Sequence, residues 1–248
     1  MSNPTIALVT GGYSSEAVIS YKSAITIEKH IDQSKYNLYR IDITPTKWFH
    51  KKPTGEEVLV NKDDFSLFMD GKKICFDAIF IGIHGTPGED GKLQGYFDLL
   101  NIPYTSCDAT TSAITFNKRY TVAIAGAAGY RVAKSHHLFK ENFQDKIELL
   151  LKMKYPVFVK PNNGGSSIGM SKLSSAEGLE DALDKAFNED DQVLVEEFIS
   201  GREFTIGVFK SNGRIITLPF TEVMSQNDFF DFEAKYQGKS TEITPAVC

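Results

Sequence analysis

Short apolar runs alternate with polar, glycine-containing segments along the first hundred residues of the chain. Residues 5–10 and 78–83 are almost wholly apolar, which is typical of parallel strands buried on both faces. Residues 36–43 predict another strand, and helical patterns follow at about 14–30 and 92–100. Strands alternating with helices indicate a parallel sheet covered on both faces, so the chain opens with an α/β domain.

Two local signals refine this first domain. Ser14 or Ser15 is a good N-terminal cap for the first helix, whose Val18, Tyr21 and Ile25 share one face. The Asp-Gly pair at 70–71 separates two short strand-like runs, which predicts a hairpin inserted into the domain.

The pattern changes after about residue 105, where α/β alternation gives way to an α+β arrangement. A helical stretch comes first, then two strands around a glycine-rich loop, a helix, a strand and a hairpin that turns at Asn212-Gly213. Residues 221–248 show no clean period. The expected ranges are 110–127, 155–160, 170–173, 175–187, 192–197, 203–210 and 214–220.

Composition narrows the class of protein. Hydrophobic residues make up 42% of the 248 residues and charged residues 24%, which is ordinary for a folded globular protein. The net charge of −5 gives no broad basic surface for nucleic acid. Three dispersed cysteines predict reduced thiols, and neither a membrane span nor a secretory signal is recognisable, so we expect a cytoplasmic protein.

The strongest chemical signal is the glycine- and serine-rich loop at 163–169. Such a loop can bring backbone N–H groups against phosphate oxygens, although a plain hairpin turn would look the same. It is not a Walker A loop, because Met170 stands where such a loop has lysine. Lys160, at the end of the apolar strand just before the loop, favours phosphate over the plain turn.

A second candidate lies at the end of the strand 192–197. Glu196 and Glu197 follow an apolar run and precede a glycine bend, which suits a hinge that reads adenine and a carboxylate that reaches a ribose. An ordinary acidic strand end explains the same residues equally well.

The first domain offers a crevice rather than a dinucleotide site. The segment 11–16 lacks the third glycine of that fingerprint. Glu16 follows the first strand and His84 the third, and the carboxyl edge of an open α/β sheet is where ligands bind. Glu16 also suits a helix N-terminus, and a lone histidine is often structural.

Ten short blocks occur in order along nearly the whole chain. They are Gly11-Gly-x-Ser-x-Glu16, Ile83-His-Gly85, Gly88-Glu-Asp-Gly91, Leu93-Gln-Gly95, Pro103-Tyr-Thr105, Lys118, Val159-Lys-Pro161, Gly165-Ser-Ser-x-Gly-Met-Ser-Lys172, Glu203-Phe-Thr205 and Asp231-Phe-Glu-Ala-Lys-Tyr236. Together these blocks resemble the D-alanine–D-alanine ligases, which are ATP-grasp enzymes. The resemblance implies a Rossmann-like, pre-ATP-grasp domain at 1–105, a central ATP-grasp subdomain at 106–205 and the start of a C-terminal subdomain at 206–248.

The resemblance also implies roles for individual residues. The ATP-binding set comprises Lys118, Lys160, Gly164, Gly165, Ser166, Ser167, Glu196, Glu197, Phe198, Ile199 and Glu203, the last on the ribose. Glu16, Ser166 and Tyr236 match a triad that orients the first D-alanine, and His84 matches a histidine near the substrate carboxylate. Lys235 matches a lysine of a mobile lid that reaches the transferred phosphate.

The implied activity is synthesis of D-alanyl-D-alanine for peptidoglycan, with ATP and Mg²⁺ or Mn²⁺, through an acyl phosphate. Tyr236 resembles the enzymes that make the dipeptide rather than those that join D-alanine to D-lactate. The alternatives are another ATP-grasp carboxylate–amine ligase and an inactive nucleotide-binding fragment. A homodimer formed through the first domain is also implied.

The chain departs from the family at its end. Members continue past position 248 with a reaction-centre arginine and the metal ligands, so we expect no metal ligands within these residues. We also expect little ligase activity from residues 1–248 alone.

Overall fold

A computed structural model describes residues 3–227, 229, 235–236 and 238–247. The chain divides into two compact units, residues 1–124 and 125–248, and each is described by itself. The finer division at 105 and 205 stays a prediction.

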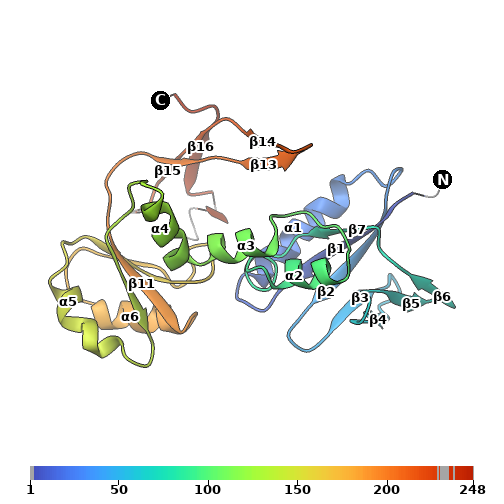
Figure 1. The fold of residues 1–248 in the computed structure, drawn as a ribbon, viewed down its shortest axis with the longest axis horizontal. Coiled ribbons are helices and arrows are strands. Elements are labelled where there is room, and N and C mark those ends of the chain that lie inside the picture. The colour runs from blue at the N-terminus through green and yellow to red at the C-terminus, as the bar shows by residue number, and fades with distance from the viewer. Residues whose placement is uncertain (1–2, 228, 230–234, 237, 248) are drawn as a thin grey trace. The chain divides into compact units, whose positions relative to one another are not determined.

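The first unit is built on a five-stranded sheet in the order β4-β3-β2-β1-β7 (Figure 1). Its centre is parallel, as expected, because β1 pairs in parallel with both β2 and β7. Two antiparallel strands, β3 and β4, extend the sheet and were not predicted. The strands span Thr5–Gly11 (β1), Asn37–Ile43 (β2), Trp48–Lys51 (β3), Glu57–Leu59 (β4) and Ala78–Ile81 (β7).

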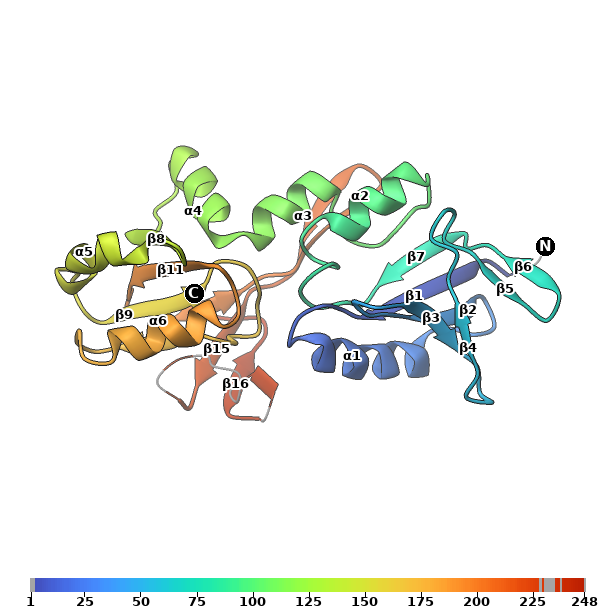
Figure 2. The ribbon, with the colours of Figure 1, turned by 90° about the horizontal axis from the view of Figure 1, so that it is seen from below.

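Helices α1 (Ala17–His30) and α2 (Lys92–Leu99) cover opposite faces of this sheet (Figure 2). Ala7 and Val9 of β1 belong to a buried cluster that includes Leu93 and Phe97 of α2. The intervening Leu8 is equally buried and points to the other face. Both faces of the central strands are therefore covered, which explains their continuous apolar sequence.

The expected details of α1 need correction. The helix begins after Glu16, which occupies the N-cap position, and not after Ser14 or Ser15. Its buried side chains are Ile19, Ser20 and Ala24, whereas Val18 and Ile25 are exposed. The pattern was misread because two small side chains, those of Ser20 and Ala24, join Ile19 on the packed face.

Two other predicted segments of the first unit are present with changed bounds. The hairpin at Asp70-Gly71 is formed by β5 (Leu67–Met69) and β6 (Lys72–Ile74). The stretch 110–127 is not one helix but two, α3 (Ala109–Phe116) and α4 (Lys118–Ala127), which meet at Asn117. Asp108 caps α3, accepting a hydrogen bond of 2.7 Å from the Thr111 amide.

The second unit has a four-stranded sheet in the order β10-β9-β11-β8, and its three neighbouring pairs are antiparallel. One face packs on α5 (Ile147–Leu151), on the 3₁₀ turn at Phe143–Lys146 and on α6 (Leu179–Phe187), which begins after Gly178 rather than near Ser175. The strands span Ser135–Phe139 (β8), Val157–Pro161 (β9), Ser171–Leu173 (β10) and Gln192–Glu197 (β11), and β8 was not predicted.

The remaining strands form two small sheets. β13 (Val208–Ser211) and β14 (Arg214–Thr217) make the predicted hairpin at Asn212-Gly213. The range expected as one strand from 203 to 210 is broken, because β12 (Glu203–Thr205) pairs instead with β15 (Thr221–Ser225). β15 also pairs with β16 (Ser240–Ile243), in a region where the sequence shows no period.

Cys75 and Cys107 are exposed free thiols, as expected, and Cys248 lies outside the described residues. Within the part of the chain that the structure describes, every helix is too short or too polar to cross a membrane.

Candidate functional site

The turn after β1 lies against the loop that follows β7. The Gly12 amide donates to the Ile43 carbonyl, and the Tyr13 amide donates to the Thr86 carbonyl, each at 2.8 Å. Gly11 has a φ of +89°, and a Cβ there would come within 2.6 Å of the Ile43 oxygen. Only glycine fits this close approach, so the sequence Gly-Gly fixes where the turn sits.

Glu16 and the loop 84–91 are neighbours at this edge of the sheet. Glu16 is only 3% exposed, and a Cβ added to Gly85 would lie 2.6 Å from its Oε2 atom. His84 is held by α1: its amide donates to Ser20 Oγ at 2.9 Å, and its Nε2 lies 3.0 Å from Ser23 Oγ. The structure thus brings Glu16 and the His84 loop together, as the sequence predicts.

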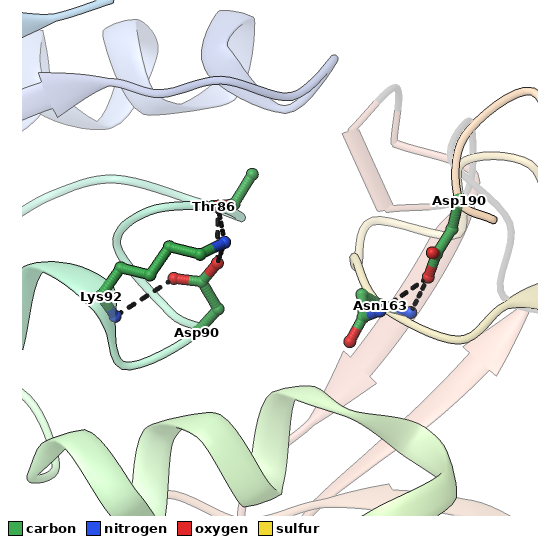
Figure 3. Close-up of polar contacts among 5 residues, drawn as sticks. All are labelled: Thr86, Asp90, Lys92, Asn163 and Asp190. Carbon is green, nitrogen blue, oxygen red and sulfur yellow. Dashed lines mark hydrogen bonds and ion pairs between the residues drawn. The ribbon is translucent and has the colours of Figure 1, made fainter. Parts of the chain in front are cut away.

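Two carboxylates that the sequence reasoning left without a role organise the same loop. Glu89 Oε2 accepts a 2.6 Å hydrogen bond from the Gly85 amide. Burial raises the pKa of the Glu89 carboxyl, that hydrogen bond lowers it, and nearby Glu16 raises it, with a net upward shift. Asp90 Oδ2 accepts from Thr86 Oγ1 and from Lys92 Nζ, each at 2.6 Å (Figure 3). Each of these carboxylates thus holds the loop residue four positions upstream of it.

In the second unit, alternate residues of β9 and β11 lie on opposite faces of the sheet. One face packs on the core, and the other, which carries Phe158, Lys160 and Glu196, is called the chemical face. Val159 stands opposite Val195, and both belong to the core under α6. The alternate residues point away from that core, and there Lys160 forms an ion pair with Glu196, with both side chains largely buried. Two candidates from different strands are therefore in contact.

Aromatic rings continue the chemical face. Phe158 of β9 contacts Phe198, with ring centroids 5.8 Å apart, and Phe229, at 5.4 Å. Lys172 is paired opposite Phe158 across β10 and β9, and its Nζ lies 4.4 Å from the centroid of Phe198. The sequence indicated Phe198 but not Phe158, which carries no motif beyond its place in an apolar strand.

The glycine loop joins β9 to β10 next to Lys160. Ser166 and Ser167 both adopt positive φ, at 52° and 57°, which is uncommon for residues other than glycine. Ser166 Oγ lies 3.0 Å from the hydroxyl of Tyr236, a hydrogen bond across 70 positions of sequence. Two of the three residues of the predicted triad are therefore bonded, and Glu16 belongs to the other unit.

The other predicted residues lie as follows. Glu197 is tied to the backbone, since its amide donates to the Lys134 carbonyl and its Oε1 accepts from the Lys134 amide, each at 2.9 Å. Ile199 is exposed, and Glu203 is exposed on β12, in a sheet separate from Lys160. Lys118 begins α4 in the first unit, and Lys235 lies in a short helical turn beside Tyr236.

Among the residues that the structure describes, no three His, Cys, Asp or Glu side chains are grouped to hold a metal ion. The location of a metal site stays a prediction.

Solved structures with this fold include two bacterial ligases. The VanG D-Ala:D-Ser ligase from Enterococcus faecalis is 30% identical with a TM-score of 0.81, and the match covers 99% of this chain and 77% of that one. D-alanyl-alanine synthetase A from Vibrio cholerae is 28% identical with a TM-score of 0.84, covering 100% and 75%. The fold, the glycine loop and the lysine beside it thus define a protein of the ATP-grasp class.

Sequence comparison identifies the family within that class. The family model of the D-ala D-ala ligase N-terminus matches residues 5–107, and that of the C-terminus matches residues 124–247. The D-alanine–D-alanine ligase of Flavobacterium johnsoniae is 45% identical over 97% of this chain and 75% of its own length. That of Parabacteroides distasonis is 46% identical over 97% and 73%. The chain belongs to the D-alanine–D-alanine ligase family.

Proposed function

We propose that the protein uses ATP to join two D-alanine molecules into D-alanyl-D-alanine, a precursor for peptidoglycan. The observation that carries the proposal is the second unit's chemical face, where a glycine loop follows the Lys160–Glu196 pair and Ser166 bonds Tyr236. The loop proposed to bind phosphate is thus hydrogen-bonded to Tyr236, which matches a family residue that orients the first D-alanine.

The reaction has two steps. A carboxylate oxygen of the first D-alanine takes the γ-phosphoryl group, and ADP leaves. The amine of the second D-alanine then attacks the acyl carbon and loses a proton, and inorganic phosphate departs with that oxygen. Positioning and charge neutralisation dominate phosphoryl transfer, so cations and N–H donors around the phosphates matter most.

The nucleotide is assigned to the second unit and Lys118. Lys160, Lys118 and the amides of Gly164, Gly165, Ser166 and Ser167 neutralise the phosphates. The strand end from Glu196 to Ile199 reads adenine, and Glu203 binds the ribose. The burial of Lys160 beside Glu196 supports this assignment, because a partly desolvated cation interacts strongly with phosphate.

The amino acid is assigned to Glu16, His84, Ser166 and Tyr236. Buried Glu16 accepts a hydrogen bond from the substrate ammonium or from the hydroxyl groups of the triad. His84 neutralises the substrate carboxylate. Lys235 contacts the transferred phosphate. The close packing of Glu16 against Gly85 supports a shared role for the first-unit loops.

Magnesium or manganese and a homodimer remain expectations drawn from the family, and the cytoplasmic location remains an expectation drawn from the sequence. The described residues offer no grouped metal ligands, so no step is assigned to a metal ion here. The use of ATP supports the cytoplasmic location.

Turnover of purified full-length protein with ATP and D-alanine tests the proposal. We expect ADP, phosphate and D-alanyl-D-alanine in equal amounts. Because the similar VanG protein is a D-Ala:D-Ser ligase, D-serine and D-lactate should be tested as second substrates. If D-alanyl-D-serine or D-alanyl-D-lactate forms in larger amounts than D-alanyl-D-alanine, the protein is a ligase of another specificity and the proposal is wrong.

A further inference from the structure

The turn after α6 holds the entrance of the glycine loop through one carboxylate. Asp190 Oδ2 accepts hydrogen bonds from both nitrogens of Asn163, the backbone amide at 2.6 Å and Nδ2 at 2.8 Å (Figure 3). The other oxygen, Oδ1, accepts from the Gln192 amide at 3.1 Å. Charge-assisted bonds of this kind are about twice as strong as neutral ones, so Asn163 is firmly held.

The residue before Asn163 strengthens the same attachment. Asn162 is completely buried, and its amide donates to the Gln192 carbonyl at 2.8 Å. The chain thus enters the loop from a fixed position beside the start of β11.

The exit of the loop is held by the same segment. Lys185 Nζ donates to the Met170 carbonyl at 2.8 Å. Gly169 has a φ of +71°, and a Cβ there would come within 2.8 Å of Pro161 Cγ and 2.9 Å of Glu189 Cγ. Residues 185–190 therefore contact both ends of the loop.

Between these ends lies the part that carries the phosphate donors. A Cβ on Gly164 would meet no other atom within 4 Å, in contrast with Gly169. The two ends of the loop are thus held by Asp190 and Lys185, and the donors assigned to phosphate lie between these two attachments.

We propose that Asp190 is a positioning residue for the nucleotide polyphosphate, acting through Asn163 on the glycine loop. The inference rests on the proposed function, and Lys185 fixes the opposite end. With both ends fixed, the loop amides are preorganised for phosphate, and the closed loop keeps water from the acyl phosphate.

Replacing Asp190 removes the loop's attachment and has two measurable consequences. Asp190→Ala should weaken ATP binding about tenfold or more, because up to three charge-assisted bonds are lost. It should also raise the ratio of phosphate released to dipeptide formed, because a loosened loop admits water. The KM for D-alanine should change much less.

Asp190→Asn keeps an oxygen that accepts from Asn163 but places an amide against the Gln192 N–H, so its effects should be intermediate. Asn163→Ala removes the Nδ2 bond to Asp190 but keeps the bond from the backbone amide, so it should shift ATP affinity in the same direction by a smaller factor. The matched control is Asp184→Asn, an exposed carboxylate on α6.

The experiment measures ATP dissociation constants by calorimetry, thermal midpoints, and the phosphate-to-dipeptide ratio for the full-length protein and these variants. A lower midpoint with ATP affinity and product ratio like those of Asp184→Asn would overturn the proposal. If Asp190→Ala does not fold, Asp190→Asn and Asn163→Ala decide by the same criteria. If the wild-type protein binds ATP but forms no dipeptide, the proposed function fails, while the ATP affinities still test Asp190.

Discussion

Lys160 and Glu196 are candidates that the sequence indicates separately and the structure joins. Their ion pair keeps the lysine side chain on the chemical face of the sheet, just before the glycine loop. A phosphate that approaches there meets a cation already fixed in place, which lowers the entropy lost on binding.

We therefore predict that Lys160→Ala weakens ATP binding by about 1.5–3 kcal/mol, the usual range for a charge-assisted contact. Lys172→Ala should cost about 1 kcal/mol or less, because Lys172 lies over the ring of Phe198. Calorimetric titration with ATP measures both variants. Equal losses would show that Lys160 has no special place at the phosphates.

Asp42 provides a pH-dependent test of the first unit. Burial raises the pKa of its carboxyl, only partly opposed by Arg40, whose Nε lies 3.5 Å from Oδ1. The folded protein thus binds the proton more tightly than the unfolded chain. The stability from this group is complete below the ordinary aspartate pKa and is lost as pH rises through the raised pKa.

Asp42→Asn should accordingly gain stability relative to wild type as pH rises from about 3.5 to 7. Asp32→Asn is the control with opposite sign, because a hydrogen bond from Lys35 lowers the pKa of Asp32. Urea unfolding at both pH values measures the differences. An Asp42→Asn difference that does not change with pH would contradict the assignment.

At the scale of elements, the glycine loop depends on the backbone at its ends. Gly164 and Gly169 both have positive φ, so alanine is strained at either position, by roughly 1–2 kcal/mol. Gly169→Ala additionally meets Pro161 and Glu189, whereas Gly164→Ala meets open space.

Gly169→Ala should therefore lower the free energy of unfolding more than Gly164→Ala does, as measured by denaturant titration. The same ranking should appear in the thermal midpoints. If Gly164→Ala were the more damaging substitution, the fixed exit of the loop would be wrong.

Elements with strong local patterns could be predicted from the sequence. The apolar runs of β1, β7 and β11 were found because these strands are buried, and the hairpin at Asn212-Gly213 was found from its turn. β3 and β16 were missed, because Trp48–Lys51 and Ser240–Ile243 mix polar and apolar residues and are stabilised by pairing with β2 and β15 rather than by a periodic pattern of their own.

The candidate site shows the same division. Lys160 and the glycine loop have a local signature, whereas Asp190 lies 27 positions from Asn163 and has none. Lys172 and Phe198 form a pair only because β10 and the end of β11 lie on either side of β9. Contacts between residues that are far apart in the sequence leave no periodic pattern in a single sequence, so only the structure could reveal them.

At the scale of the whole molecule, the proposed function links residues that are far apart in the chain. Ser166 and Tyr236 are hydrogen-bonded, so Ser166→Ala and Tyr236→Phe should be non-additive in kcat/KM for D-alanine, with a coupling of about 0.5–3 kcal/mol. A double-mutant cycle measures the coupling. Strict additivity would show that the hydrogen bond has no part in turnover.

The route of one oxygen atom tests the central claim most directly. Full-length protein is supplied with ATP and with D-alanine carrying ¹⁸O in both carboxylate oxygens, and the released phosphate is analysed by mass spectrometry. Ligation through an acyl phosphate predicts one ¹⁸O in each phosphate and equal amounts of phosphate and D-alanyl-D-alanine. Unlabelled phosphate, or labelled phosphate without dipeptide, would contradict the account.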